Sequence, residues 1–203
     1  MFVQLLISAL LSGSIYGLIA LGYSLIYRAS GIMNLAQGDL MCLGGFLGYT
    51  FFSVLKLPFL VSLVLTVVCC FIIGCILEKF VIRPIFKRST TTSVIILATV
   101  AVSYIIQSLE IVGWGAAPLS MPSFLKTSTV TIFGVIYQTE SLLCIAIAII
   151  FMLSIHFFMK KSRFGIAMRA AAMDPLAAGS CGINVNSTTR ITWAISTTVA
   201  GLA

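Results

Sequence analysis

The chain has 203 residues, of which 60% are hydrophobic and only 8% are charged. A soluble domain carries roughly 25% charged residues, so this composition cannot build a water-exposed surface and excludes a soluble enzyme. The net charge of +7 comes from basic residues that flank apolar segments, so it indicates membrane topology and contact with anionic lipid, not a nucleic-acid-binding surface.

Long uncharged runs predict helices that cross a lipid bilayer. About 20 apolar residues cross the hydrocarbon core, and most of the runs approach this length without the apolar–polar alternation of membrane strands. A further segment, Ser30–Val54, is long enough but contains the acid Asp39. The runs are Phe2–Tyr27, Leu57–Leu77, Thr91–Leu109, Ser141–Met159 and Ile191–Ala203. We predict an all-α polytopic transmembrane helix bundle, a single domain over residues 1–203, with five complete spans and the start of a sixth. We expect the natural chain to continue with more helices.

Small residues recur in the first two predicted spans at the spacing that lets helices pack closely in lipid. Ala9, Gly13 and Gly17 are four residues apart in the first span, and Gly44 and Gly48 repeat this spacing in the second. We interpret both sets as helix-packing faces.

One polar cluster, Asn34, Gln37 and Asp39, lies inside a predicted span. If the helix begins near Ser30, Asp39 lies about 13 Å along it, close to the bilayer midplane. A charged side chain at that depth costs about 3 kcal/mol, so it should face protein or a water-filled cavity. These three residues are candidates for a substrate pathway. An interhelical hydrogen bond, or a protonated acid without a role in transport, explains Asp39 equally well. An extended entry before the helix begins would move Asp39 toward the cytoplasmic surface.

The connections after the third and fourth spans differ in composition. Arg83–Pro84 lies in a basic connection, and we predict that it ends the third span because proline disrupts a helix interior. The segment Ile111–Glu140 contains a β-branched stretch, Thr127–Ile136, which predicts a short hairpin at the membrane surface. Trp114 and Tyr137 are candidate interfacial anchors. The segment is equally consistent with a lid, a simple connector or a contact for an external partner.

The segment 160–190, after the fifth span, predicts a short capped helix. Asp174 is a favourable N-cap residue and Pro175 suits the first helical position. Leu176–Cys181 makes fewer than two turns, and Gly182 suits the left-handed conformation after a helix. Isolated helices of this length are marginal in water, so we expect this one to dock onto the bundle or onto another protein.

The basic residues predict the orientation of the bundle. If every span crosses once, ten of them lie on one side and only Lys56 and Lys126 on the other. The positive-inside rule makes the ten-residue side cytoplasmic, which places the N-terminus outside and the segment 160–190 inside. The ten are Arg28, Lys79, Arg83, Lys87, Arg88, Lys160, Lys161, Arg163, Arg169 and Arg190.

The sequence offers no constellation of residues for bond chemistry. It has no phosphate-binding loop with Gly-Lys-Ser or Gly-Lys-Thr, no metal-ligand cluster, no Gly-x-Ser-x-Gly elbow and no carboxylate pair at helical spacing. The six cysteines lack metal-ligand spacing and read as small buried hydrophobic residues. We therefore predict no catalytic residue, no metal and no cofactor in this chain. If ATP drives its function, another polypeptide must hydrolyse it.

Two stretches resemble the permeases that import branched-chain amino acids, a family of ATP-binding-cassette transporters. The first covers Ser12–Tyr27 and Gly31–Asp39, and the second begins with Lys161–Ala170. The second continues through Asp174, Ala177, Ala178 and Gly182–Asn184. They stand in the family's order, and the similarity runs essentially from end to end of the chain.

The resemblance implies a cytoplasmic coupling loop over residues 160–190. Its short helix partly fits the broader importer pattern Glu-Ala-Ala-x-x-x-Gly, although Leu176 stands where the glutamate would be and the Ile-x-Leu-Pro tail is absent. In the family this helix docks into a cleft on the ATPase. The ATPase-coupling residues that the resemblance implies are Asp174, Pro175, Ala177, Ala178 and Gly182.

The resemblance also implies the partners and the cargo. The chain would be a permease subunit in a bacterial inner membrane that passes aliphatic amino acids inward, beside a second permease subunit. Two cytoplasmic ATP-binding subunits would hydrolyse ATP, and an extracytoplasmic solute-binding protein would deliver the solute. The alternatives are a permease of the same family for urea or short amides, an ion-driven transporter or channel in which Asp39 carries protons, and a membrane scaffold without a solute.

Overall fold

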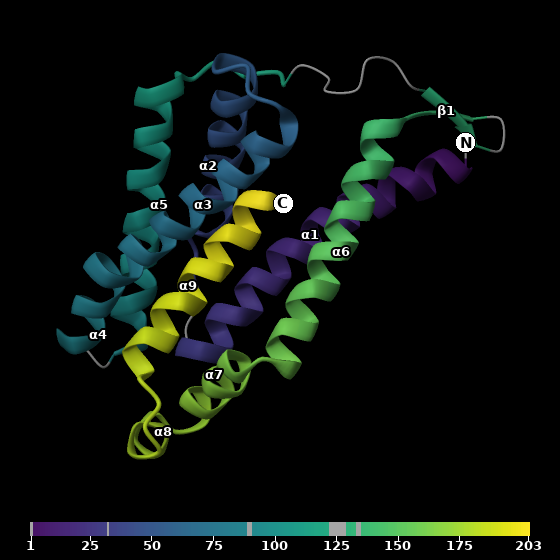
Figure 1. The fold of residues 1–203 in the computed structure, drawn as a ribbon. Helices are drawn as coiled ribbons and strands as arrows, with labels where there is room; N and C mark the ends of the chain where they lie inside the picture. The colour runs from purple at the N-terminus through teal and green to yellow at the C-terminus, as the bar shows by residue number, and fades with distance from the viewer. Residues whose placement is uncertain (1, 32, 89–90, 122–128, 133–134) are drawn as a thin grey trace.

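The computed structural model describes residues 2–31, 33–88, 91–121, 129–132 and 135–203, and Figure 1 shows them as an elongated bundle of helices. The prediction of an all-α membrane bundle is confirmed, with one short hairpin at its edge. The helices are α1 (Phe2–Ser30), α2 (Gln37–Tyr49), α3 (Phe59–Leu77), α4 (Arg83–Arg88), α5 (Thr92–Trp114), α6 (Thr139–Lys161), α7 (Arg163–Met173), α8 (Pro175–Ser180) and α9 (Val185–Leu202). Two π-helical turns, η1 (Thr50–Val54) and η2 (Glu78–Ile82), directly follow α2 and α3.

Four of the described helical segments are long and apolar enough to cross a membrane. They correspond to four of the predicted complete spans. They are Ser8–Arg28, Phe59–Phe86, Ser93–Trp114 and Leu143–Lys161. The predicted start of a sixth span is a helix, α9, which begins at Val185, before the predicted Ile191.

The prediction of a continuous second span from Ser30 is wrong. α1 continues through Ser30 and stops at Gly31, whose φ of +69° is the left-handed conformation that glycine adopts readily. The chain then runs without helix until Gln37, because the Asn34 side chain accepts a hydrogen bond from the Ala36 N–H. α2 is therefore shorter than the predicted second span and follows a non-helical stretch.

The prediction that Arg83–Pro84 ends the third span is also wrong. The helix continues from α3 through η2 into α4, and the span that can cross a membrane extends to Phe86. Proline has no N–H to donate, and the π-helical turn just before Pro84 is the kind of irregularity that accommodates such a residue inside a helix.

α9 is the central helix of the bundle. It lies between α1 on one side and α3 on the other, and it also packs against α2 (Figure 1). Small residues permit this packing: a Cβ added to Gly44 of α2 would lie 2.2 Å from Cα of Gly201. A Cβ on Gly74 of α3 would lie 2.7 Å from Cα of Ala194. The predicted packing role is thus confirmed for Gly44.

The other predicted packing positions differ from one another. Gly17 of α1 faces α6, with Met152 Sδ 3.3 Å from an added Cβ, whereas an added Cβ on Gly13 meets nothing within 4 Å. An added Cβ on Gly48 meets only Thr66 Oγ1 at 3.7 Å, an ordinary contact. Only part of each small-residue face is therefore used inside this chain.

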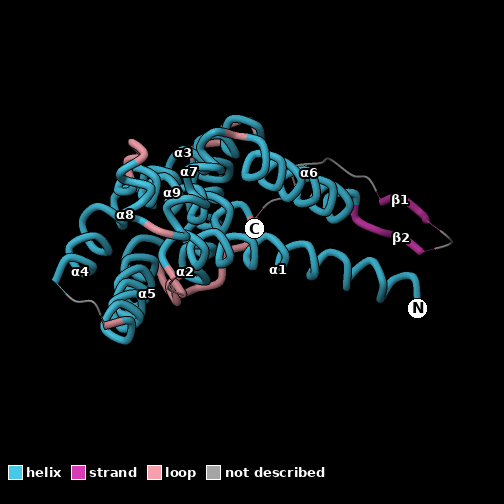
Figure 2. Tube along the Cα trace, turned by 90° about the horizontal axis from the view of Figure 1, so that it is seen from below, coloured by secondary structure: helices cyan, strands magenta, loops and turns pink. Residues whose placement is uncertain are grey.

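The predicted hairpin is present. β1 (Thr129–Ile132) pairs antiparallel with β2 (Val135–Gln138), and Figure 2 shows the two strands at the far end of α6. α5 ends at Trp114, where Gly115 has a φ of +85°. The anchoring side chain predicted at Tyr137 lies outside the described side chains.

Candidate functional site

α2 and α5 run side by side in a fixed register. Three hydrogen bonds join them with the same offset of 64 residues. Near the start of α2, the Leu35 N–H donates to Thr99 Oγ1 at 3.2 Å. Near its end, Trp114 Nε1 donates to Thr50 Oγ1 at 2.7 Å, and its ring stacks on Phe46.

The third of these bonds places Asp39 at the middle of α5. Ser103, the central residue of this 23-residue helix, donates its hydroxyl to Asp39 Oδ2, and Gln107 Nε2 donates to Oδ1 at 2.8 Å. As the alternative prediction required, the chain is non-helical before α2. Asp39 nevertheless lies inside the bundle and not at its end. The reason is that α2 begins deep between the other helices.

Asn34 and Gln37 hold the start of α2 at that depth. Both side chains are fully buried, with Asn34 Nδ2 3.3 Å from Gln37 Oε1. Gln37 Nε2 donates to Ser196 of α9, and Ser196 Oγ donates to the Gly22 carbonyl of α1. Gly22 lies eight residues before the end of α1, so this junction is about 12 Å inside the bundle. These contacts give the Asn34 and Gln37 side chains a structural role. A role of either residue in a substrate pathway stays a prediction.

A second acid, Glu110 of α5, joins Asp39, and sequence reasoning missed it. Glu110 is 7% exposed and interacts electrostatically with Asp39 and with Cys42 of α2. No hydrogen-bond partner reaches its Oε1 among the described residues. A signal was available: Ser103, Gln107 and Glu110 are spaced by four and three residues, which places them on one face of a helix. The uncharged run stops at Leu109 because Glu110 is charged, but α5 continues to Trp114.

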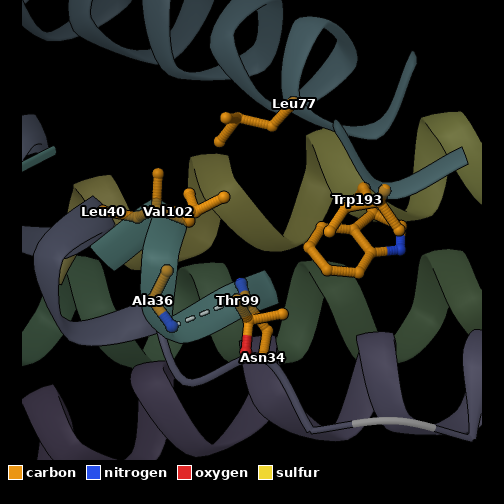
Figure 3. A pocket seen from close by; sticks show the side chains of 8 residues that line it. Asn34, Ala36, Leu40, Leu77, Thr99, Val102 and Trp193 are labelled. Carbon is orange, nitrogen blue, oxygen red and sulfur yellow. Dashed lines mark hydrogen bonds between the residues drawn. The ribbon is translucent and has the colours of Figure 1, made fainter. Parts of the chain in front are cut away.

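Two internal spaces adjoin α2. Figure 3 shows the smaller, about 10 Å³, between Asn34, Thr99, Leu77 and Trp193. It is about the size of one water molecule and cannot hold a solute. The larger, about 640 Å³, is lined by Cys42, Gly44 and Gly45 of α2, with mainly apolar walls from α1, α3 and α6 and from the end of α9. Asp39 lines neither space.

The segment between α6 and α9 forms the short capped helix that the sequence predicted. Asp174 is the N-cap of α8, and its Oδ1 accepts hydrogen bonds from the N–H groups of Leu176 and Ala177 at 2.9 and 3.1 Å. Gly182 has a φ of +84°. The Ile183 N–H donates a hydrogen bond to the Ala178 carbonyl at 3.0 Å, which gives a partner to a carbonyl in the last turn of the helix.

α8 is docked on its own chain along one side only. Ala178 is 5% exposed, whereas Leu176 is 85% exposed and Met173, just before the cap, is 89% exposed. α8 contacts α7 and α9, and Figure 1 places it at the lower end of the bundle, on the same side as α4. Two large apolar side chains thus project from this end.

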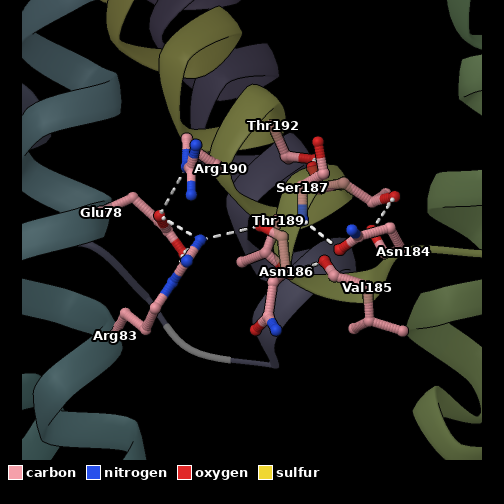
Figure 4. Close-up of polar contacts among 10 residues, drawn as sticks. Glu78, Arg83, Asn184, Val185, Asn186, Ser187, Thr189, Arg190 and Thr192 are labelled. Atoms are coloured by element: carbon pink, nitrogen blue, oxygen red, sulfur yellow. Dashed lines mark hydrogen bonds and ion pairs between the residues drawn. The ribbon is translucent and has the colours of Figure 1, made fainter. Parts of the chain in front are cut away.

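An ion-pair network holds the start of α9 to the end of α3. Glu78 of η2 is 2% exposed; its Oε2 lies 2.8 Å from Arg83 Nη2 and 3.6 Å from Arg190 Nε of α9 (Figure 4). Arg83 Nη2 also donates to the Asn186 carbonyl at 2.9 Å. The sequence indicated both arginines only as markers of topology. Arg83 is five residues from Glu78, but Arg190 lies on a helix more than a hundred residues away, so its pairing with Glu78 depends on the fold.

No group of three or more potential metal ligands lies together within the described part of the chain. A family model described as the permease component of the branched-chain amino acid transport system matches residues 5–203. No solved structure matches the chain.

Two similar proteins come from bacteria. The high-affinity branched-chain amino acid transport system permease protein BraD of Pseudomonas aeruginosa is 25% identical over 214 residues, which cover 100% of this chain and 69% of BraD. The corresponding permease protein LivH of Escherichia coli K12 is 24% identical over 214 residues, again 100% of this chain and 69% of the relative.

A third relative comes from an archaeon. The probable branched-chain amino acid transport permease protein LivH of Methanocaldococcus jannaschii is 25% identical over 209 residues, which cover 98% of this chain and 64% of the relative. The chain therefore spans about two thirds of the length of the curated relatives that it matches.

Proposed function

This chain belongs to the branched-chain amino acid transport permease family, and we propose that it is the membrane-spanning subunit of an ATP-driven importer of aliphatic amino acids. The observation that carries the proposal is the family match over residues 5–203, together with four helices able to cross a membrane among the described residues. The chain performs no bond chemistry in this account. It provides the route, and separate subunits hydrolyse ATP.

The ATPase partner binds at α8. A helix of six residues does not persist alone in water, and α8 offers its exposed apolar residues to a second surface. Leu176 and Met173 make the contact, while Asp174, Pro175 and Gly182 hold the helix in shape. Ala177 lies on the exposed side of α8, and Ala178 seats the helix on its own chain.

Movement of α8 reaches the membrane through α9. Only residues 181–184 separate the two helices, and Asn184 caps α9 by accepting a hydrogen bond from the Ser187 N–H at 3.1 Å. α9 is buried along most of its length against α1, α2 and α3. When two ATP-binding subunits close on ATP, the shift of α8 therefore tilts the central helix.

The remaining parts of the proposal follow the family. The end of the bundle that carries α7 and α8 is cytoplasmic and the N-terminus is outside, in the inner membrane of a bacterium. A second permease subunit completes the passage, and an extracytoplasmic solute-binding protein delivers the solute to the opposite end.

The test is uptake by the complete natural assembly in proteoliposomes. The full-length chain, a second permease subunit, the two ATP-binding subunits and the binding protein are reconstituted, and radiolabelled leucine uptake is measured with ATP inside. We expect uptake that requires ATP and the binding protein. Uptake by the full-length chain alone, driven by a proton gradient without ATP, would contradict the proposal and favour an ion-driven transporter. Uptake of urea but not leucine would keep the importer and change its solute.

A further inference from the structure

We propose that Asp39 and Glu110 form a binding site for an ammonium group, which receives the amino group of the solute on its way through the membrane. The proposal deepens the proposed function and rests on it. It selects a solute that carries a positive charge and disfavours urea and other neutral amides.

The charge of the site favours a positively charged ligand. Asp39 of α2 bonds Ser103 and Gln107 of α5, and Glu110 lies three residues beyond Gln107 on the same face of α5, so two carboxylic acids from neighbouring helices lie close together and interact electrostatically. Among the described side chains, no lysine or arginine forms an ion pair with either of them. A carboxylate in the bilayer core needs a positive partner, because hydrocarbon does not solvate it. The protein supplies hydrogen-bond donors to Asp39 but no counter-charge.

Glu110 has a vacant hydrogen-bond acceptor. The residue is only 7% exposed, and its Oε1 has no partner among the described residues. Buried acceptors are almost always hydrogen-bonded, and an unpaired one costs about 1–3 kcal/mol. Asp39, by contrast, uses both of its oxygens, with Ser103 and Gln107 as donors. The vacancy is specific to the deeper-buried acid.

The two acids are accessible from one side of α2. Asp39, in the first turn of α2, is only partly buried and Gln107 is exposed, although Ser103, which bonds Asp39, is the central residue of α5, a helix able to cross a membrane. Cys42, three residues after Asp39 on α2, is exposed and lines the space of about 640 Å³. A ligand can therefore approach the acids from this side, whereas Asn34 and Gln37 on the other side of α2 are fully buried.

The chemistry of an ammonium group fits this arrangement. It carries one positive charge and three N–H donors, so it can donate to Glu110 Oε1 and remain near Asp39. Urea offers donors but no charge and would leave two carboxylates uncompensated. Ser103 and Gln107 already hold Asp39 in place, so the site is organised before the solute arrives.

The native thiol of Cys42 reports on the site, because it lies three residues after Asp39 on α2 and interacts electrostatically with both acids. Every other cysteine in the full-length chain is replaced by alanine, and the assembled complex is treated with a cationic trimethylammonium methanethiosulfonate or with the anionic sulfonate reagent. We measure the ratio of the reaction rate with the cationic reagent to the rate with the anionic reagent. For Cys42 we expect this ratio to be about tenfold or more higher than for a free thiol in solution. Leucine should slow the reaction.

The variants Glu110→Gln and Asp39→Asn should each reduce this preference several-fold. Ser108→Ala is the matched control on α5, because Ser108 bonds only to the Tyr104 carbonyl and should leave the preference unchanged. Equal reaction with both reagents, or no reaction with either, would overturn the proposal. So would a Glu110→Gln variant that keeps the full preference, since Glu110 would then be a neutral acid.

Uptake separates this proposal from the proposed function. In the reconstituted assembly, Glu110→Gln should reduce leucine uptake per ATP hydrolysed by about tenfold, with ATP hydrolysis within twofold of the unaltered complex. If the unaltered assembly imports leucine and the variant matches it, the ammonium site is wrong and the importer stands. If the unaltered assembly imports nothing with ATP, the proposed function fails, whatever reagent preference Cys42 shows.

Discussion

The Asp39 carboxylate of α2 accepts a hydrogen bond from the Gln107 amide of α5, with 2.8 Å between Oδ1 and Nε2. This contact lies between two others at the ends of the pair, Leu35 with Thr99 and Trp114 with Thr50. The two helices are therefore fixed in register along their shared length.

Gly44→Ala should destabilise the bundle, because the new Cβ would lie 2.2 Å from Cα of Gly201 and the backbones of α2 and α9 would have to separate. We expect a loss of about 1–3 kcal/mol, typical of overpacking, measured as a lower unfolding temperature of the full-length protein in detergent. Gly45→Ala is the control, since its Cβ meets nothing within 4 Å. Equal unfolding temperatures for the two variants would refute this packing.

Glu78→Gln should loosen the start of α9. The substitution leaves Arg83 and Arg190 without a counter-charge, but their side chains are 20% and 37% exposed and water partly solvates them. We therefore expect the free energy of unfolding to fall by about 2 kcal/mol, which is below the range for breaking a fully buried pair. Denaturant unfolding of the full-length protein measures it, with Lys79→Gln at the neighbouring exposed position as the control. A loss no larger than that of the control would mean that the network adds nothing.

Leu176→Asp should abolish capture of the ATP-binding subunits by the purified permease. An acid in the first turn suits the helix dipole, so α8 should remain folded while its apolar contact is lost. Leu176→Met keeps an apolar side chain and should retain capture. The measurement is the amount of ATP-binding subunit that co-purifies with the tagged full-length chain. Unchanged capture by the aspartate variant would place the contact elsewhere.

Asp174→Ala should weaken coupling by fraying α8. It removes the acceptor of two N–H groups, at a cost of about 1 kcal/mol in helix stability. Leucine uptake per ATP hydrolysed should fall in the reconstituted assembly, whereas Asp174→Asn should preserve it because asparagine caps equally well. If the alanine variant couples as well as the asparagine variant, the cap is irrelevant to transport.

Local signals predicted much of this fold. The apolar runs located four spans, and the residues around Asp174 and Gly182 predicted both ends of α8. The β-branched stretch predicted the hairpin. In each case the residues that determine the element lie within one short segment of the chain, so the sequence of that segment is enough to predict it.

Other features depend on contacts that no single segment reveals. A helix from Ser30 was predicted because the composition is apolar, but Gly31 and Asn34 stabilise a non-helical entry that is held by Ser196, far along the chain. Glu110 is a candidate because α2 packs beside α5 and brings Asp39 to the same face of that helix. The pairing of Glu78 with Arg190 likewise depends on how α3 meets α9.

The account depends most on the side of the membrane that α8 faces, and the native Cys181 can report it. Cys181 is exposed at the end of α8, so a membrane-impermeant maleimide can be applied to oriented vesicles that contain the full-length chain with Cys181 as its single cysteine. We predict labelling in inside-out vesicles only, and the opposite pattern for a Lys56→Cys control in the loop between η1 and α3. Labelling of Cys181 in right-side-out vesicles would put α8 out of reach of any ATP-hydrolysing subunit and contradict the account.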